Sequence, residues 1–216
     1  MTTLSGKTAV VTGASRGIGR ASALALAGRG AQVLVHYSSG MKEAEAVVAE
    51  IRQAGGRADT VAADLSEPDG AHKLAKQVRA VVGDRLDILV ANAGLSRSAS
   101  IEDTTVEDFD RLFAVNVRAP FFLVQQLLPI MCRDSSIVLV SSLAAHAAVG
   151  TLSAYAATKV RSTPGEAFRR RAWRAWYPRQ RRGARCRCDR HVELRQDGRR
   201  AGLRARHPGS EASRPA

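Results

Sequence analysis

Short apolar runs alternate with stretches of helical periodicity over residues 1–159. Apolar runs without polar alternation are typical of parallel strands whose two faces are covered by helices. Strands that alternate with helices in this way predict one doubly wound parallel sheet of the α/β class, a Rossmann-type arrangement. We expect its strands at Thr8–Val11, Gln32–His36, Thr60–Ala63, Leu86–Ala91 and Ile137–Val140.

Four helices are expected between these strands, over residues 20–30, 41–56, 71–83 and 106–131. The first three patterns stop at glycine, which commonly ends a helix. The fourth is longer and contains Pro120, so we expect it to be kinked or broken near Asn116.

The charge of the chain divides it into two parts. Residues 1–159 hold 16 basic and 15 acidic side chains, whereas residues 160–216 hold 17 arginines, no lysine and five acids. At 216 residues the chain is long enough for one domain with a buried core. We therefore expect a single domain over residues 1–159, truncated after its fifth strand, and a disordered or irregular tail over residues 160–216.

The sequence also favours a cytoplasmic location. No run approaches the roughly 18 consecutive apolar residues of a membrane span, and the N-terminus lacks the pattern of a signal peptide. The three cysteines are too few and too unevenly placed for a disulfide framework. No membrane partner is expected.

A glycine-rich turn follows the first strand in "VTGASRGIGR", with glycines at Gly13, Gly17 and Gly19. Glycine lets the backbone turn tightly and approach a pyrophosphate, whose charge meets the free N–H groups at the start of the next helix. The spacing differs from the commoner G-x-G-x-x-G fingerprint. A structural turn is the alternative, but its place in the first strand–helix unit favours a dinucleotide site.

Several spaced motifs together resemble the short-chain dehydrogenase/reductase family, most nearly its 3-oxoacyl-carrier-protein reductase type. They are "TGASRGIG" at 12–19, "ADL" at 63–65, "ANAG" at 91–94, "VNV" around Asn116, "VSS" around Ser142, and "YAATK" from Tyr155 to Lys159. The resemblance implies an oxidoreductase that transfers hydride between NADP and a small-molecule carbonyl or secondary alcohol. It also implies four catalytic residues, which are Asn116, Ser142, Tyr155 and Lys159, with Tyr155 as the acid/base. It implies that the cofactor contacts Gly13, Ser15, Arg16, Gly17, Ile18, Gly19, Tyr37, Ser38, Asp64, Leu65, Asn92, Ala93, Gly94, Tyr155 and Lys159.

The chemistry of the last motif can be argued from the residues themselves. A tyrosine phenol keeps its proton at neutral pH, so it transfers that proton only where its anion is stabilised. Lys159 lies four residues after Tyr155 and hence on the same helix face, where its ammonium can stabilise the phenolate. Ser142 can hydrogen-bond a substrate carbonyl oxygen, and Asn116 can hold a water that links Lys159 to solvent. A packed aromatic and a solvated charge are the alternatives for Tyr155 and Lys159.

The expected cofactor is NADP rather than NAD. Sites selective for NAD place an acid about 20 residues beyond the glycine turn, whereas the second strand here ends "HYSS" without a carboxylate. Arg16 can pair with a ribose 2′-phosphate, although it can also be a plain surface arginine. Asp64 can accept from the adenine amino group or cap the following helix, and Asn92 can tie the fourth strand to its neighbour.

The arginine-rich tail has three open interpretations. It can be a nucleic-acid arm with Trp173, Trp176 and Tyr177 as stacking residues. Alternatively, Cys186, Cys188 and His191 can be metal ligands, although a fourth ligand at standard spacing is missing. The third is translation out of frame, which the absence of lysine favours, because out-of-frame reading of a GC-rich gene gives CGN codons and therefore arginine alone.

The genetic code supports the third interpretation. Synonymous codons for Gly165–Leu194, read from their second base, can encode a continuous segment containing "RVNAVAPG", which resembles the family's sixth strand and Pro-Gly loop. Residues 160–164 match the family only in a different reading frame. A chain without that loop and the substrate lid is expected to bind cofactor weakly and turn over little, and its homotetramer or homodimer assembly is in doubt. A non-catalytic nucleotide-binding remnant is therefore the alternative function, and nucleic-acid binding through the tail is a third.

Resequencing the coding DNA tests the frameshift. We expect the codons of residues 165–216 to encode a family-like segment when they are read from the second base of each. A coding sequence that does not give this segment would end the hypothesis.

Overall fold

The computed structural model describes residues 3–147 and 150–159. Their elements in chain order are β1 Thr8–Val11, α1 Gly17–Ala27, β2 Gln32–Tyr37, α2 Met41–Gln53, β3 Arg57–Ala62, α3 Gly70–Val82, β4 Leu86–Ala91, α4 Val106–Phe113, η1 Ala114–Arg118, α5 Ala119–Leu127, η2 Leu128–Ile130, β5 Met131–Leu139, η3 Leu143–Ala145 and α6 Ser153–Lys159. The arginine-rich segment, with the proposed stacking and metal-binding residues, lies outside the described residues.

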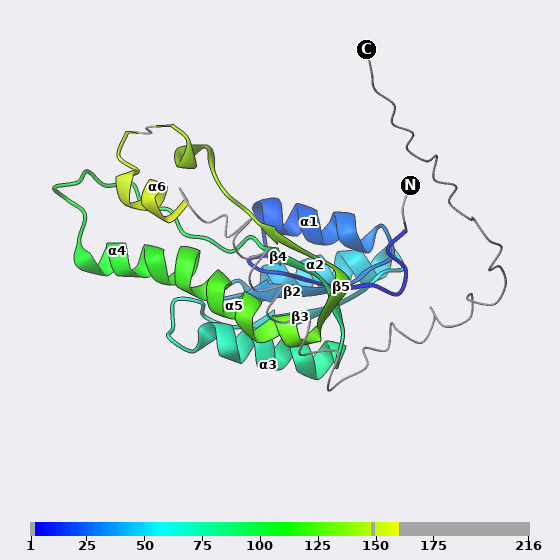
Figure 1. Cartoon of the computed structure of the whole chain (residues 1–216). Coiled ribbons are helices and arrows are strands. Elements are labelled where there is room, and N and C mark those ends of the chain that lie inside the picture. Colours follow the sequence, from blue (N-terminus) through cyan, green and yellow to red (C-terminus); the bar gives the residue numbers. More distant parts are fainter. Residues whose placement is uncertain (1–2, 148–149, 160–216) are drawn as a thin grey trace, which may run out of the picture.

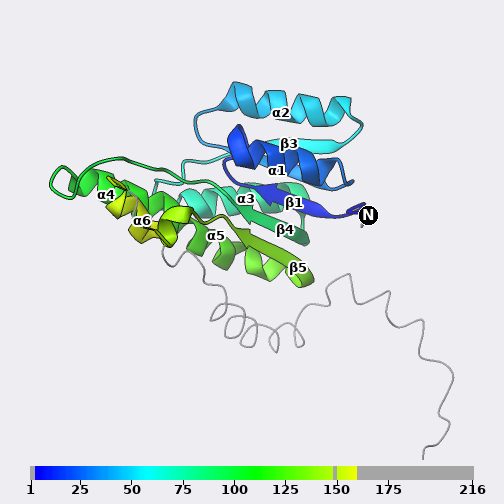
Figure 2. The same ribbon diagram turned by 90° about the horizontal axis from the view of Figure 1, so that it is seen from above.

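The five strands form one sheet in the order β3-β2-β1-β4-β5, and every neighbouring pair is parallel (Figures 1 and 2). This confirms the predicted doubly wound architecture. The order reverses between β1 and β4, so the loops that follow these two strands lie side by side. In open α/β sheets, ligands bind in the crevice at this reversal point.

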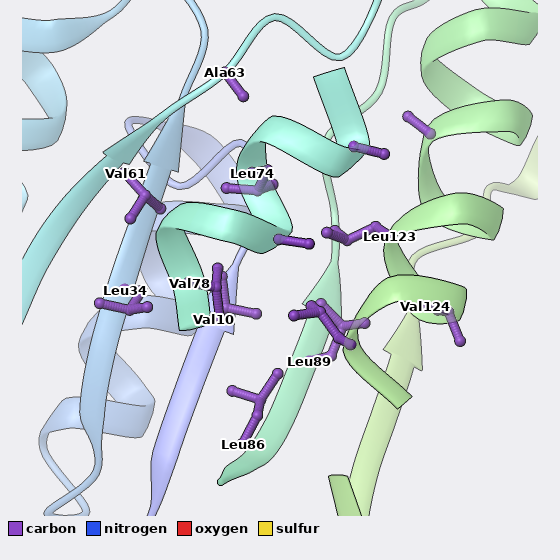
Figure 3. Packing of buried hydrophobic residues seen from close by; sticks show 14 of the residues in the cluster. Val10, Leu34, Val61, Ala63, Leu74, Val78, Leu86, Leu89, Leu123 and Val124 are labelled. Atoms are coloured by element: carbon purple, nitrogen blue, oxygen red, sulfur yellow. The ribbon is translucent and has the colours of Figure 1, made fainter. Parts of the chain in front are cut away.

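Alternating side chains of the strands build two core clusters, one on each face of the sheet. On one face Val10, Leu34 and Leu89 pack with Leu74 of α3 and Leu123 of α5 (Figure 3). On the other face, the next residues along the same strands pack against α1 and α2; they include Ala9, Val11, Val33, Val35 and Val90. The continuous apolar runs in the sequence therefore reflect burial on both faces, as expected for a parallel sheet.

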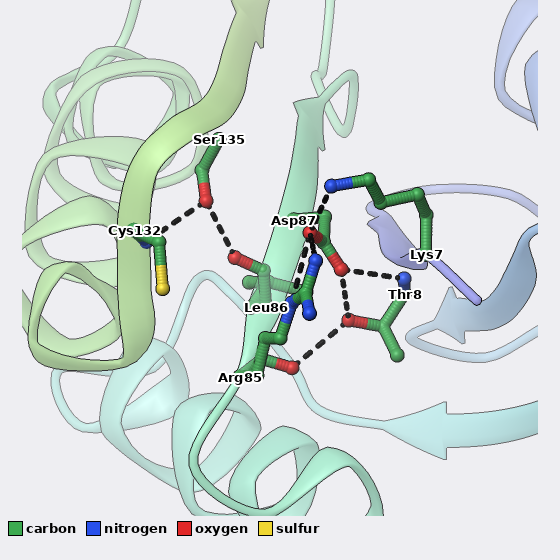
Figure 4. A network of polar contacts seen from close by, with 7 residues as sticks. All are labelled: Lys7, Thr8, Arg85, Leu86, Asp87, Cys132 and Ser135. Carbon is green, nitrogen blue, oxygen red and sulfur yellow. Dashed lines mark hydrogen bonds and ion pairs between the residues drawn. The ribbon is translucent and has the colours of Figure 1, made fainter. Parts of the chain in front are cut away.

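The strand β5 begins at Met131, earlier than the predicted Ile137, because hydrogen bonds pair its polar first half with β4. The Cys132 N–H donates to Ser135 Oγ, and the Ser135 hydroxyl donates to the Leu86 carbonyl (Figure 4). The pairing register shifts at this point. Within the described residues β5 is the edge of the sheet, and Val138 near its end is exposed.

The fourth helical stretch runs continuously from Val106 to Ile130, with an irregular turn rather than a break near Asn116. Residues Ala114–Arg118 form a π-helical turn that contains Asn116. By length and composition alone this stretch could cross a membrane, and 44% of its most apolar window is buried. Because Leu123 and Leu127 belong to the core cluster, we interpret it as a core helix.

Asp87 is the centre of a polar network at the end of the sheet where the strands begin. Asp87 is 4% exposed. Its carboxylate accepts hydrogen bonds from Lys7 Nζ at 2.9 Å, the Thr8 N–H at 3.0 Å and Arg85 Nη2 at 2.7 Å (Figure 4). Burial opposes ionisation, but the hydrogen bonds from Arg85 and Lys7 outweigh it and hold the pKa of Asp87 below its usual value. The network ties β1 to β4.

Asp87→Ala should lower the free energy of unfolding by about 3 kcal/mol, because it leaves buried donors without an acceptor. Asp59→Ala is a matched control: Asp59 also pairs with an arginine, Arg52, but its side chain is 41% exposed, so about 0.5 kcal/mol or less is expected. Urea unfolding measures both variants. Equal losses in the two would show that the network contributes nothing beyond a surface pair.

Candidate active site

The glycine turn joins β1 to α1 in a shape that only glycine supports at three positions. Gly13 and Gly17 have φ angles of +62° and +57°. A Cβ on Gly19 would lie 2.2 Å from the Gly13 carbonyl oxygen, whereas a Cβ on Gly17 would meet nothing within 4 Å. The start of α1 therefore faces open space, which suits it to receive a phosphate. Of the other residues expected in this turn, Ser15 is half-buried, and Arg16 and Ile18 are exposed.

Asn92 and Thr12 hold the turn against the loop that follows β4. Asn92 Nδ2 donates to the carbonyl oxygens of Thr12 at 2.9 Å and Gly13 at 3.2 Å. The Thr12 hydroxyl accepts from the N–H groups of Asn92 at 3.0 Å and Ala93 at 2.9 Å. These bonds make Asn92 a tie between β4 and β1, in addition to any contact with a cofactor.

His36 holds the same turn from the side of β2. Its Nδ1 accepts from the Gly13 N–H at 3.0 Å, and its Nε2 lies 3.1 Å from the Ala63 carbonyl oxygen. Burial lowers the pKa of His36 to about 4, against smaller opposing effects of the Ala63 carbonyl and Asp64. His36 was not predicted as a site residue, although a lone polar side chain in the apolar run "VLVHY" is a usable signal.

The residues expected on the adenine side lie at the ends of β2 and β3. Tyr37 and Leu65 are buried, and Ser38 and Asp64 are exposed. Hydrogen bonds from the N–H and hydroxyl of Ser66 to Asp64 Oδ1 hold the pKa of Asp64 below its usual value. Asp64 thus closes a turn rather than capping α3, whose N-cap is Asp69.

Asn116 connects the loop after β4 to α6. Its Oδ1 accepts from the Leu95 N–H at 2.9 Å, and its Nδ2 donates to the Leu95 carbonyl at 2.8 Å and to Thr158 Oγ1 at 3.0 Å. Thr158 is 1% exposed and its hydroxyl also donates to the Tyr155 carbonyl at 2.6 Å. Thr158 was not predicted, but a hydroxyl between Tyr155 and Lys159 in "YAATK" is its sequence signal. Both N–H groups of the Asn116 side-chain amide donate to protein atoms. The predicted water that links Lys159 to solvent would therefore have to bind an oxygen atom of Asn116.

Lys159 and Tyr155 share one face of α6, as their spacing predicts. Lys159 is 6% exposed; its Nζ donates to the Val140 carbonyl at 3.1 Å and lies 5.8 Å from the centre of the Tyr155 ring. Burial lowers the pKa of Lys159. A Cβ on Gly94 would lie 3.2 Å from Asn116 Oδ1 and 3.6 Å from Lys159 Nζ. The loop after β4, the π turn and α6 therefore meet at one point.

Ser142 lies just beyond β5, where the short helix η3 begins and packs against α6. Its hydroxyl oxygen accepts from the Ala144 N–H at 3.3 Å, and the side chain is half-buried. The structure brings Asn116 and Lys159 close to the same residue, Gly94, and places Ser142 at the start of η3, which packs against α6. His146, which follows η3, is exposed and belongs to a loop, as its sequence position suggests.

Comparison with known proteins decides the family. A family model described as short chain dehydrogenase matches residues 7–163. The chain belongs to the short-chain dehydrogenase family. Among curated relatives, the short-chain dehydrogenase/reductase FrzI of Cladobotryum sp is 42% identical over 153 residues, which cover 71% of this chain and 59% of FrzI. The chain thus spans less than two thirds of the length of this relative.

Two solved structures of reductases are also similar to this chain. The angucycline C-6 ketoreductase LanV with bound NADP has a TM-score of 0.73 and 41% identity, covering 82% of this chain and 70% of LanV. A 3-oxoacyl (acyl-carrier-protein) reductase from Agrobacterium tumefaciens C58 with NADP bound has a TM-score of 0.69 and 36% identity, covering 74% of this chain and 62% of that one.

The buried His36 should make stability fall in mild acid. Its pKa is about 4 when folded and 6.5 ordinarily, so between these values the unfolded chain binds more protons. The free energy of unfolding therefore falls as the pH drops from 6.5 to 4, by about 3 kcal/mol for the whole shift. Urea unfolding across this range measures it, with His36→Asn, which cannot titrate, as control. Equal pH slopes in both proteins would contradict the assignment.

Proposed function

We propose that this chain carries the NADP-binding and proton-transfer half of an oxidoreductase that interconverts a carbonyl and a secondary alcohol. The observation that carries the proposal is the meeting of Gly94, Asn116 and the buried Lys159 beside Tyr155. A buried amine with a perturbed pKa, four residues from a phenol and next to a cofactor-type loop, is typical of a catalytic site.

The described residues fit NADP. The open space at Gly17 lies at the start of α1, where free N–H groups and the helix dipole favour a pyrophosphate. Tyr37 at the end of β2 is buried and Ser38 is exposed, so this strand end offers no carboxylate to repel a 2′-phosphate. The exposed Arg16 can pair with that phosphate. NADP in the LanV and acyl-carrier-protein reductase structures supports this choice.

The proposed proton transfer uses Ser142, which follows β5, and two residues of α6, Tyr155 and Lys159. When bound, NADPH supplies the hydride that a carbonyl carbon receives. Tyr155 donates its phenolic proton to the carbonyl oxygen, and the Ser142 hydroxyl donates a hydrogen bond to that oxygen. Lys159 stabilises the phenolate that remains, because its charge lies beside the ring in a poorly solvated position.

Asn116 supports the proposed proton transfer by fixing two segments, the loop after β4 and α6. Its amide joins Leu95 to Thr158, so the loop after β4 and the helix of Tyr155 keep one relative position. A second acceptor site on Oδ1, or the backbone carbonyl in the widened π turn, can hold a water in a relay to Lys159.

The substrate is proposed to be an apolar ketone. Two leucines directly follow the proposed site residues Gly94 and Ser142: Leu95 is 36% exposed and Leu143 is 75% exposed. Exposed leucines at a site offer apolar contact to a ligand. The angucycline ketone of LanV and the acyl chain of the acyl-carrier-protein reductase are the two kinds of substrate to test.

Assembly with a second copy is also proposed. One face of the α4–α5 stretch carries apolar side chains at helical spacing, which are Val106, Phe109, Phe113, Val117 and Phe121. All except the half-buried Phe113 are exposed. A contiguous apolar patch of this kind marks an interaction surface, and a symmetric dimer would cover it with the same patch.

A non-catalytic nucleotide-binding role is the second candidate. The observation that favours it is the extent of the match, which ends at residue 163 and covers 59% of FrzI. In this case the chain would bind NADPH without turning over a carbonyl.

Arg16→Ala should weaken NADPH binding by about tenfold, the equivalent of 1.4 kcal/mol, because it removes the partner of the 2′-phosphate. NADH binding should change by less than about twofold. Fluorescence titration of the reduced cofactors measures both. Arg20→Ala is the control, since Arg20 is also exposed on α1 but pairs with Glu50. Equal losses for NADPH and NADH would refute the role of Arg16.

Tyr155→Phe should abolish carbonyl-dependent NADPH oxidation while leaving NADPH affinity within about threefold. The full 216-residue chain is incubated with polycyclic aromatic ketones and with 3-oxoacyl thioesters, and the alcohol product is quantified. We expect slow product formation, below about 1 per second, that vanishes in the variant. Unchanged product formation in Tyr155→Phe would contradict its role, and NADPH binding without any product would favour the non-catalytic alternative.

A further inference from the structure

His36 is a buried imidazole that the proposed proton chemistry does not use. It lies on β2, between β3 and β1 in the sheet, and is 1% exposed. Its neighbours along β2 are apolar and belong to the core. Burying a polar ring in such a place costs free energy unless its nitrogens are hydrogen-bonded. Both ring nitrogens of His36 have hydrogen-bond partners.

The hydrogen bonds of His36 fix its tautomer. A backbone N–H can only donate, so the bond from Gly13 requires Nδ1 to be unprotonated. A carbonyl can only accept, so the bond to Ala63 requires the proton on Nε2. The low pKa caused by burial keeps the ring neutral at physiological pH, and Nδ1 therefore stays available as an acceptor.

The partner of Nδ1 is the most constrained residue of the glycine turn. Gly13 has a φ of +62°, and its carbonyl oxygen both contacts Gly19 closely and accepts from Asn92 Nδ2. Its N–H is satisfied by His36 alone among the hydrogen bonds of the described residues. His36 on β2 and Asn92 in the loop after β4 thus hold the two peptide groups of Gly13 from opposite sides of β1.

The partner of Nε2 lies at the other end of the proposed dinucleotide site. The Ala63 carbonyl follows β3 and directly precedes Asp64. In the glycine turn, the N–H of Ala14, which follows Gly13, also donates to the His36 backbone carbonyl at 2.8 Å. A single residue therefore joins the turn that would meet the pyrophosphate to the strand end that would meet the adenine.

We propose that His36 is a positioning residue for dinucleotide binding, which fixes the Gly13 peptide through Nδ1 and the start of the Asp64 turn through Nε2. The proposal rests on the proposed function, since it assigns to His36 the preshaping of the same NADP site. A preshaped turn binds more tightly because no binding free energy is spent on ordering it.

Two substitutions separate the two hydrogen bonds. His36→Asn places an amide oxygen where Nδ1 lies and so keeps the acceptor for Gly13, but it is too short to reach Ala63. His36→Gln can place an amide N–H where Nε2 lies and so keeps the donor to Ala63, but it offers Gly13 no acceptor. The two variants are similar in polarity and differ mainly in which bond survives.

NADPH titration of the full chain by fluorescence is the first measurement. We expect His36→Asn to bind within about threefold of the unsubstituted chain and His36→Gln to bind about tenfold more weakly, a difference of about 1.4 kcal/mol. Hydrogen exchange of the Gly13 amide without ligand should be about tenfold faster in His36→Gln only. Equal affinities and equal exchange in the two variants would overturn the proposal.

The outcomes also separate this proposal from the proposed function. If the unsubstituted chain binds no NADPH, the proposed function fails and the nucleotide role of His36 fails with it, while Gly13 exchange still reports whether His36 orders the turn. If either variant does not fold, nitrogen NMR of the unsubstituted chain decides. A neutral ring with its proton on Nε2 agrees with the proposal, and a proton on Nδ1 overturns it.

Discussion

The peptide groups of Gly13 are the point on which the candidate site depends. Gly13 lies in the turn after β1 with a left-handed backbone, and two side chains, one from β2 and one from the loop after β4, hold it there: His36 accepts its N–H and Asn92 donates to its carbonyl. The absence of a side chain at Gly19 lets α1 start close to that carbonyl. The loops that follow β1 and β4, where the strand order reverses, therefore have a fixed shape at the place where a ligand would bind.

The second half of the site depends on a different device, the side chain of Asn116 in a π-helical turn. The extra width of this turn carries Asn116 to the Leu95 backbone and to Thr158, so the long α4–α5 stretch sets the position of α6. Lys159 reaches back to the Val140 carbonyl at the end of β5. These side-chain contacts hold α6, and with it Tyr155, against the rest of the site.

The sequence predicted most of this fold because its signals are local. The apolar runs at β1 and β4 match the observed strands, and the position of Pro120 indicated an irregularity near Asn116, where the structure has a π-helical turn. The start of β5 was missed because its first half is polar, and a hydrogen bond from Ser135 to Leu86 decides its pairing. His36 and Thr158 were missed because the groups they bond lie far away in the sequence: the Gly13 N–H for His36 and the Asn116 side-chain amide for Thr158. The roles of the site residues remain predictions.

The central proposal is that residues 3–147 and 150–159 present a formed NADP site within this 216-residue chain. Hydrogen exchange of the full chain with and without saturating NADPH tests it most directly. The account predicts that NADPH slows exchange by at least about tenfold in two separate segments, 13–19 and 92–95, and leaves the amides of α2 unchanged. Exchange that is the same in both segments with and without NADPH would contradict it.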